Sequence, residues 1–428
     1  MFDFSRCLLV MTAVAVLLAS CASAAPGADG ETGMAAEPDP AGVSRAAWLT
    51  RDWNEIEAAA MGTTVHFYAW GGDPQINRWL QGYVANELQR RHNLRLQLVP
   101  MDTGDIVNKL VNELAAGRDP GSIDLMWVNG ENFRTAREAD ALLGPVDEPL
   151  PNFRAYVDAG APEFRYDFGM PVAGYEVPWG QGQFVMIYDQ ARVPDPPRSL
   201  VQLEDWVRRN PGRFTYPAPP DFTGSALLRT LLYDAVDGYE KYLQDELPSP
   251  ELEARAEALW DILYQMKPYL WEQGRSYPSS LGRQHELFST GEVWLTMAYG
   301  PNEAAQKVKS GLFPETTRTF VFESGTLANT HFLAVAANAA NVPGALVAAN
   351  FLLSPEAQLS KYDLNHWGDL PVLDPARAPE SYRRQLAEWP RHEATLAPET
   401  LEAHKIPELP PFYVDRLEEL WAQHVLRR

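Results

Sequence analysis

The sequence predicts an α/β protein that folds into two compact domains, and three observations support this prediction. Its 428 residues exceed one ordinary domain and suit two. Hydrophobic residues make up 46% of the chain, a globular composition that can fill two cores. Residues 63–128 alternate strand-like and helix-like segments, an order that builds a mostly parallel sheet with helices on both faces.

The alternation is clearest at the start of the folded part. Apolar residues alternate through the first predicted strand, and apolar residues at helical spacing follow it. Asp73 suits the N-cap of this helix, and Pro74 suits its first turn. The predicted strands cover 63–69, 94–99 and 123–128, and the predicted helices between them cover 74–91 and 105–116.

The second half of the chain predicts further elements and contains no internal repeat. Strand-like stretches cover 182–189, 292–299 and 331–336, and helix-like stretches cover 203–209, 225–236, 251–271, 281–290, 343–353 and 414–425.

The first twenty residues have the pattern of a targeting segment. An apolar run from Cys7 to Leu18 is too short to span a membrane. It ends in Leu-Ala-Ser-Cys, which looks like the lipobox of bacterial lipoproteins, so we expect a signal peptide over 1–20 and a lipid on Cys21. Cleavage after Ala24 is the alternative and would release a soluble protein. Residues 21–47 are rich in Ala, Gly, Pro and acidic residues, which predicts a flexible tether.

The charge of the chain argues against nucleic acid as a partner. Its net charge is −21 and its pI is near 4.8, whereas phosphate backbones require clustered Lys and Arg. The same acidity favours a cationic ligand, or it reflects solubility or a saline habitat.

The sequence carries no signature of an enzyme, so we expect no catalytic residues, no cofactor and no metal site. Two His-Glu pairs, at 285–286 and 392–393, begin like a zincin helix, but Ser289 and Leu396 stand where the second zinc ligand is required. There is neither a Gly-x-Ser-x-Gly nucleophile elbow nor a phosphate-binding loop. The two catalytic carboxylates of a glycosidase come close only in the folded protein, so no sequence motif marks them. An envelope hydrolase that acts on a sugar is therefore the alternative from a different functional class.

Candidate ligand-binding residues follow the predicted strands of the first unit. Trp70, Gly71 and Asp73 follow the first strand, and Asn129 and Glu131 follow the third. Because ligands of such sheets bind beyond the carboxyl ends of the strands, these residues predict a site at one edge of the sheet. Asp73 and Glu131 are the carboxylates placed to meet a positive solute, although an N-cap role alone also explains Asp73.

Three tryptophans, Trp70, Trp127 and Trp179, lie at or beside predicted strand ends. The face of a Trp ring can stack on a planar solute or hold a cation. Packing inside a domain core is the alternative for each of them. We expect all three to face the ligand site.

A proline-rich segment over 216–224 leads into a predicted helix that carries Asp221, Thr223 and Ser225 at its start. Thr223 and Ser225, together with exposed N–H groups of the helix start, suit a phosphate or a carboxylate. Simple capping of the helix by a Ser or Thr is the alternative.

Four segments together resemble a known family. They are 67–73 (Phe-Tyr-Ala-Trp-Gly-Gly-Asp), 124–133, 216–224 and 365–369 (Asn-His-Trp-Gly-Asp). With the leader, the tether and the helix over 343–353, they look like the extracellular solute-binding proteins of ABC importers. The resemblance is to the YnjB-type branch over nearly all of residues 50–425. That branch is often grouped with binders of thiamine, polyamines and iron.

The resemblance implies the type II periplasmic-binding-protein fold, in which two lobes, each a mostly parallel sheet flanked by helices, enclose a ligand cleft. The implied crossings between the lobes are near 178–183, 299–301 and 335–338. Lobe one is then expected over 50–178 plus 300–335, and lobe two over 184–298 plus 338–428. Tyr299, Asn302 and Trp367 complete the candidate ligand-binding set.

The resemblance also implies the function. We expect a monomeric substrate-binding lipoprotein that captures a small organic solute by hinge closure and delivers it to the permease and ATPase subunits of an ABC importer. Thiamine or a phosphorylated relative is the first candidate solute, because Trp faces and Glu131 would suit its cationic rings, and Thr223 and Ser225 its phosphate. A polyamine or an iron-type solute is the alternative, although the adjacent Tyr pair of many iron binders is not evident.

Overall fold

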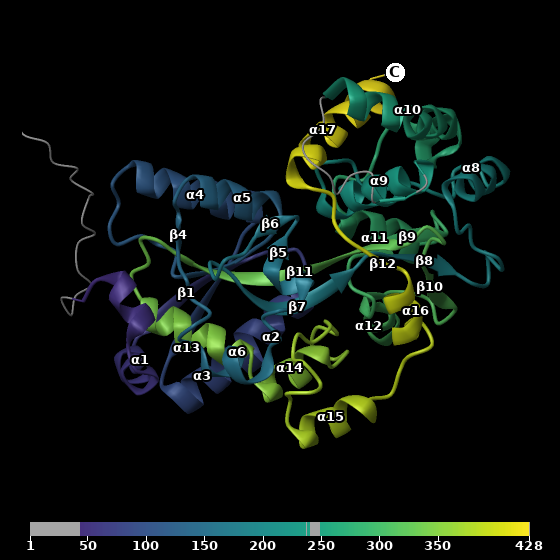
Figure 1. Ribbon diagram of the computed structural model, residues 1–428. Coiled ribbons are helices and arrows are strands. Elements are labelled where there is room, and N and C mark those ends of the chain that lie inside the picture. The colour runs from purple at the N-terminus through teal and green to yellow at the C-terminus, as the bar shows by residue number, and fades with distance from the viewer. Residues whose placement is uncertain (1–42, 237, 240–248, 428) are drawn as a thin grey trace, which may run out of the picture. The chain divides into compact units, whose positions relative to one another are not determined.

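The computed structural model of the protein describes residues 43–236, 238–239 and 249–427 (Figure 1). The predicted signal peptide, Cys21 and most of the predicted tether lie outside these residues. In the part of the chain that is described, no helix combines the length and the apolar composition that crossing a membrane requires.

The larger sheet contains the predicted strand–helix–strand unit. Its strands β1 (Thr64–Ala69), β2 (Arg95–Pro100) and β3 (Leu125–Val128) are parallel, as predicted, with bounds within two residues of the expected ones. The long strand β11 (Thr326–Ala336) lies antiparallel beside β3. The remaining strands all pair with β11, and they are β4 (Leu142–Leu143), β7 (Val177–Gln183) and β12 (Lys405–Ile406).

Helices pack on both faces of this sheet (Figure 1). The helices of this part of the molecule are α1 (Trp53–Ala60), α2 (Pro74–Trp79), α3 (Ala85–His92), α4 (Thr103–Ala115), α5 (Glu131–Glu138), α6 (Pro151–Tyr156), α7 (Pro162–Arg165), α13 (Val342–Leu352), α14 (Pro355–Tyr362) and α15 (Glu380–Ala387), of which α15 packs on α14. A π-helical turn over Leu80–Val84 joins α2 to α3, so the predicted helix over 74–91 is essentially continuous.

The smaller sheet differs from the prediction in strand direction. Its strands β8 (Val185–Asp189), β9 (Leu295–Ala298) and β10 (Thr317–Phe320) are all antiparallel, whereas a mostly parallel sheet was expected in each lobe. The helices around it are α8 (Leu200–Arg209), α9 (Phe222–Ala235), α10 (Ser249–Met266), α11 (Leu281–Ser289), α12 (Glu303–Lys309), α16 (Pro398–Ala403) and α17 (Pro411–Trp421). β5 (Tyr166–Asp167) and β6 (Met170–Pro171) form a separate two-stranded antiparallel sheet.

The hydrophobic cores divide the chain differently from the predicted lobes. The core of lobe one combines side chains from 48–179 with side chains from 333–386, including all of α13. The cores of lobe two draw mainly on 184–327 and 394–425. Residues 300–325 therefore belong to lobe two and 338–386 to lobe one, the reverse of the prediction, because α13 packs on α1 and β1.

Two paired strands and one returning segment connect the lobes. β7 leads from Trp179 in the first core to Phe184 in the second, at the predicted first crossing. β11 leads back from Leu327 to Leu333, a few residues before the expected place, and its register shifts after His331. The last crossing follows α15, whereas the expected crossing at 299–301 stays within lobe two.

Candidate functional site

The loop after β1 is shaped by two glycines that let Trp70 fold back over it. A Cβ atom on Gly72 would lie 2.1 Å from the Trp70 ring, and one on Gly71 would lie 2.5 Å from Cβ of Pro100. Only glycine avoids both contacts, since it carries no side chain. The Asn77 side-chain amide also donates to the Gly71 carbonyl oxygen at 2.9 Å. The Trp-Gly-Gly sequence thus fixes the position of Trp70.

The structure brings the four predicted tryptophans together in lobe one. The ring of Trp127 lies 6.5 Å from Trp70, 5.3 Å from Trp179 and 5.2 Å from Trp367 between centroids. Trp179 and Trp367 are 5.0 Å apart. His331 from β11 stacks on Trp367 at 5.7 Å. We call these four tryptophans and His331 the aromatic cluster.

Members of the aromatic cluster differ in exposure. Trp179 has an exposed fraction of 0% and Trp127 one of 8%, whereas Trp70 and Trp367 are half-buried. Phe67 and Trp79 also contact Trp179, at 6.0 and 6.5 Å. In this conformation Trp179 packs as a core residue, and Trp70 and Trp367 present the accessible surface. Because Trp179 has no exposed face, the structure does not support the prediction that it contacts the solute.

A buried ion pair that the sequence did not predict adjoins the aromatic cluster. The ammonium of Lys361 lies 2.8 Å from Oδ2 of Asp369, and it donates to the carbonyl oxygens of Trp179 and Leu370 at 2.5 and 3.0 Å. Nε2 of His331 lies 3.3 Å from the other carboxylate oxygen. Burial lowers the pKa of Lys361, and the negative charge of Asp369 opposes this lowering. The pair ties the loop that carries Trp367 to β7.

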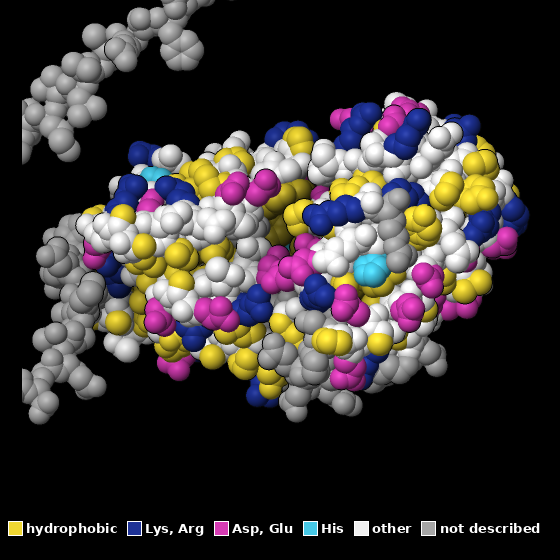
Figure 2. Space-filling view, turned by 90° about the horizontal axis from the view of Figure 1, so that it is seen from above, with side chains coloured by type: hydrophobic (Ala, Val, Ile, Leu, Met, Phe, Trp, Pro, Cys, Tyr) yellow, Lys and Arg dark blue, Asp and Glu magenta, His cyan; other side chains and the backbone are white. Residues whose placement is uncertain are grey.

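Glu131 begins α5, directly after β3. The N–H of Gly130 donates to the buried carboxylate of Asp167, which holds the turn before Glu131. One turn later, Arg134 lies 3.3 Å from Asp415, so α5 of lobe one contacts α17 of lobe two. Figure 2 looks onto the face that carries these helices, and the surface is hollowed where the two lobes meet.

Carboxylates from both lobes gather near Glu131. Burial raises the pKa of Glu131. The negative charges of Asp415 and Glu408 in lobe two add to this rise, and the positive charge of Arg229 opposes it. Burial likewise raises the pKa of Glu418, with Glu131 and Asp415 adding to the rise. Because α5 contacts α17, carboxylates of the two lobes raise one another's pKa at this boundary.

The start of α9 is not open to an anion, contrary to the expectation for Thr223 and Ser225. Asp221 caps the helix, and its Oδ1 accepts from the N–H groups of Thr223 and Gly224 at 3.0 and 2.9 Å. The Ser225 hydroxyl donates to Glu418 at 2.6 Å and accepts from Arg229. The helix is capped, but by Asp221 and not by the Ser or Thr that the alternative named, so a carboxylate of the protein already occupies the helix start.

The other predicted site residues occupy mainly structural positions. Asp73 caps α2 by accepting from Gln75 N–H at 2.6 Å, and Lys307 of lobe two lies 3.5 Å away. Asn129 is half-buried in the loop after β3. The Asn302 amide donates to the Gly368 carbonyl oxygen at 2.8 Å, which joins α12 to the Trp367 loop. The Tyr299 hydroxyl is hydrogen-bonded to Glu408.

Sequence reasoning missed Arg229, Glu408 and Phe222. Arg229 and Glu408 form a buried ion pair with 3.0 Å between Nε and Oε2. Phe222 is 38% exposed at the start of α9 and lies 5.0 Å from the Tyr299 ring. A lone arginine among the apolar residues of the predicted helix 225–236 was the available signal, since buried charges require partners.

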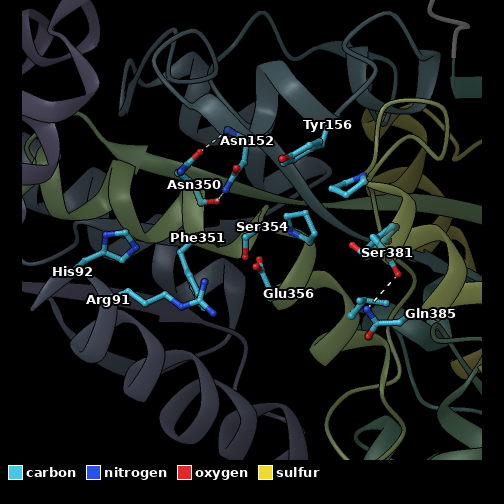
Figure 3. A pocket seen from close by; sticks show the side chains of 14 residues that line it. Arg91, His92, Asn152, Tyr156, Asn350, Phe351, Ser354, Glu356, Ser381 and Gln385 are labelled. Carbon is cyan, nitrogen blue, oxygen red and sulfur yellow. Dashed lines mark hydrogen bonds between the residues drawn. The ribbon is translucent and has the colours of Figure 1, made fainter.

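Two cavities lie apart from most predicted site residues. The larger, of about 550 Å³, lies in lobe one and is lined by Arg91, Asn152, Asn350, Glu356 and others, as Figure 3 shows. In that view Asn152 and Asn350 bond each other, which occupies much of their polar capacity. The smaller, of about 390 Å³, borders β7, β11 and Asn302. Within 43–236, 238–239 and 249–427, no group of three or more His, Cys, Asp or Glu forms a metal-binding arrangement.

Comparison with known proteins identifies the family. Residues 84–390 match the family described as bacterial extracellular solute-binding protein. Protein YnjB of Escherichia coli K12 is 41% identical over 373 residues, which cover 86% of this chain and 93% of that protein.

Solved structures agree in fold. The spermidine/putrescine ABC transporter substrate-binding protein PotD of Streptococcus pneumoniae superposes with a TM-score of 0.58 at 14% identity, covering 85% of this chain and 98% of that one. A periplasmic thiamin binding protein superposes with a TM-score of 0.58 at 16% identity and covers 85% of this chain. Both have the type II periplasmic-binding-protein fold. The chain therefore belongs to the bacterial extracellular solute-binding proteins and is the solute-binding protein of an ABC transporter.

Proposed function

We propose that this protein is a monomeric lipoprotein that captures a small organic cation for an ABC importer, by closing its two lobes, without chemical change to the solute. One observation carries the proposal: α5 of lobe one contacts α17 of lobe two, and Glu131 of α5 interacts electrostatically with Glu408, Glu418 and Asp415 of lobe two. Burial and mutual repulsion raise the pKa of Glu131 and Glu418, and a cation between the lobes would relieve that repulsion.

A thiamine-like solute fits this proposal best. The half-buried rings of Trp70 and Trp367 offer surfaces that can stack on a planar cationic ring. The structural resemblance to a thiamin binding protein also favours a thiamine-like solute. The loss of the anion site at Thr223 and Ser225 removes the reason to prefer a phosphorylated form. A polyamine is the second candidate, because several carboxylates at the lobe boundary suit several ammonium groups.

We expect thiamine or a polyamine to raise the thermal midpoint saturably, without being consumed. The same solute should reduce the radius of gyration in small-angle scattering, because a bridging cation favours the closed state. The Glu131→Gln variant should bind it about tenfold more weakly, as one charge-assisted contact is lost. Glu138→Gln, at the far end of α5, is the control. A panel of organic cations that shifts neither midpoint nor radius would contradict the proposal.

Lipidation of Cys21 rests on the Leu-Ala-Ser-Cys sequence. We expect the full precursor to fractionate with membranes and the Cys21→Ser precursor to appear in the soluble envelope fraction, since only a lipid would hold the mature protein at the membrane. Cell fractionation with antibody detection measures the split. Equal partition of both forms into the soluble fraction would favour cleavage after Ala24 instead.

A further inference from the structure

One donor atom of Arg229, Nη2, has no acceptor at hydrogen-bond geometry among the described residues, although the Tyr299 hydroxyl lies beside the guanidinium. The side chain is 1% exposed. Its Nε donates to Glu408 at 3.0 Å and its Nη1 to Ser225 at 2.8 Å. Within the described part of the chain, Nη2 has no hydrogen-bond partner. Buried polar groups in proteins are nearly always hydrogen-bonded, so an acceptor that a bound solute brings to Nη2 would stabilise the side chain.

The guanidinium of Arg229 lies where the two lobes meet. Its Cζ atom is 5.7 Å from the ring of Phe168, which lies between β5 and β6, and 5.7 Å from the ring of Phe222. Glu131 of lobe one acts electrostatically on it. Opening of the lobes would withdraw Glu131 from Arg229 and leave Phe222 in place, whereas Phe168 packs in the core of lobe two. The unpaired donor therefore belongs to the boundary that a captured solute would occupy.

The charges around Arg229 decide what kind of acceptor it can take. Glu408 neutralises the guanidinium directly, and Glu131 and Glu418 add further negative charge to the same cluster. A carboxylate or phosphate brought to Nη2 would be repelled by these groups. A hydroxyl or carbonyl oxygen would accept the hydrogen bond without that repulsion.

We propose that Arg229 selects, within the class of organic cations inferred above, solutes that carry a neutral hydroxyl or carbonyl oxygen and rejects those that carry an acidic group there. The inference rests on the proposed function. The cationic part of the solute meets Glu131 and Glu418, its oxygen accepts from Nη2 of Arg229, and the exposed ring of Phe222 flanks the connecting atoms. The contact forms only when the lobes close.

The test compares matched solutes on the wild-type chain by calorimetric titration. The first series is thiamine, thiamine monophosphate and the thiamine analogue that lacks the hydroxyl group. The second is choline, glycine betaine and ethyltrimethylammonium. In the series that binds, we expect the hydroxyl cation to bind about ten- to hundredfold more tightly than the analogue without oxygen, and the acidic analogue to bind most weakly.

The Arg229→Lys variant provides the second arm. Lysine keeps the positive charge beside Glu408 but has no Nη2, so the preference for the hydroxyl cation should fall to within about twofold, while the oxygen-free cation keeps its affinity. Thermal unfolding confirms that the variant is folded. If it does not fold, the wild-type series alone decides. Equal affinities across the wild-type series, or a preference for the acidic member, overturns the inference even though cations bind. Failure of every organic cation, polyamines included, overturns the proposed function itself.

Discussion

Replacement of Trp179 by Ala is expected to lower the free energy of unfolding by about 3–5 kcal/mol, the usual cost of removing a large core aromatic. Trp179 is fully buried, and rings of Phe67, Trp79 and Trp127 surround it. The cavity left behind is walled by rigid aromatic rings that cannot collapse into it, so a value near the upper end is expected. Equilibrium unfolding in urea without solute measures the change.

Trp70→Ala is the matched variant for this measurement. Trp70 is half-buried and lies at the edge of the aromatic cluster, so its loss should change stability by much less than that of Trp179. It should instead weaken solute binding about ten- to hundredfold, through lost stacking and cation–π attraction. If Trp70→Ala unfolds as easily as Trp179→Ala and keeps full affinity when folded, the aromatic cluster is core packing and not a ligand wall.

Lys361→Met is expected to destabilise the fold by about 3–5 kcal/mol, because it leaves the carboxylate of Asp369 buried without its counter-ion. The exposed fractions of these side chains are 0% and 2%. Lys361 also donates to two backbone carbonyl oxygens, which lose this donor. Although burial opposes ionisation of Asp369, Lys361 and His331 overcome it and lower its pKa. Urea unfolding of the variant at neutral pH measures the loss.

Two further variants locate the cause of that loss. Lys309→Met removes an exposed lysine from the end of α12 and should change stability by less than about 0.5 kcal/mol. The double variant Lys361→Met/Asp369→Leu removes both charges and should recover part of the stability. Because the folded-state pKa of Asp369 lies below its unfolded value, the contribution of Asp369 is present above that unfolded value and is lost as pH falls. A double variant less stable than the single one would show that the carbonyl contacts, not the charges, dominate.

The sequence predicted the elements of lobe one well because their signals are local. The parallel strands β1, β2 and β3 carry apolar patterns, and Asp73 with Pro74 marks the start of α2. The assignment of α13 failed for a physical reason. Every residue of Val342–Leu352 is buried, so no polar face indicates which core receives the helix. The antiparallel direction of β8 to β10 depends on pairing partners distant in sequence.

The candidate site was predictable only where one short segment defines it. The loop over 70–73 and the turn before Glu131 follow strands directly, whereas the cap of α9 comes from Asp221 and not from the expected Ser or Thr. Arg229 and Glu408 are 179 positions apart, and each alone reads as an ordinary charged residue. Burial of Trp179 likewise depends on Trp367, which comes from the other end of the lobe.

The composite core of lobe one has a consequence for synthesis of the chain. Arg45 donates through Nε to the carbonyl oxygen of Ala339 at 2.6 Å, across 294 positions of sequence, and α13 covers β1 and α1 nearby. At ribosomal rates of about 5–20 residues per second, those 294 positions correspond to about 15–60 s. For that interval the apolar side of β1 has no helix α13 to cover it. Any holding chaperone that binds this uncovered strand would keep lobe one from folding until α13 has been synthesised.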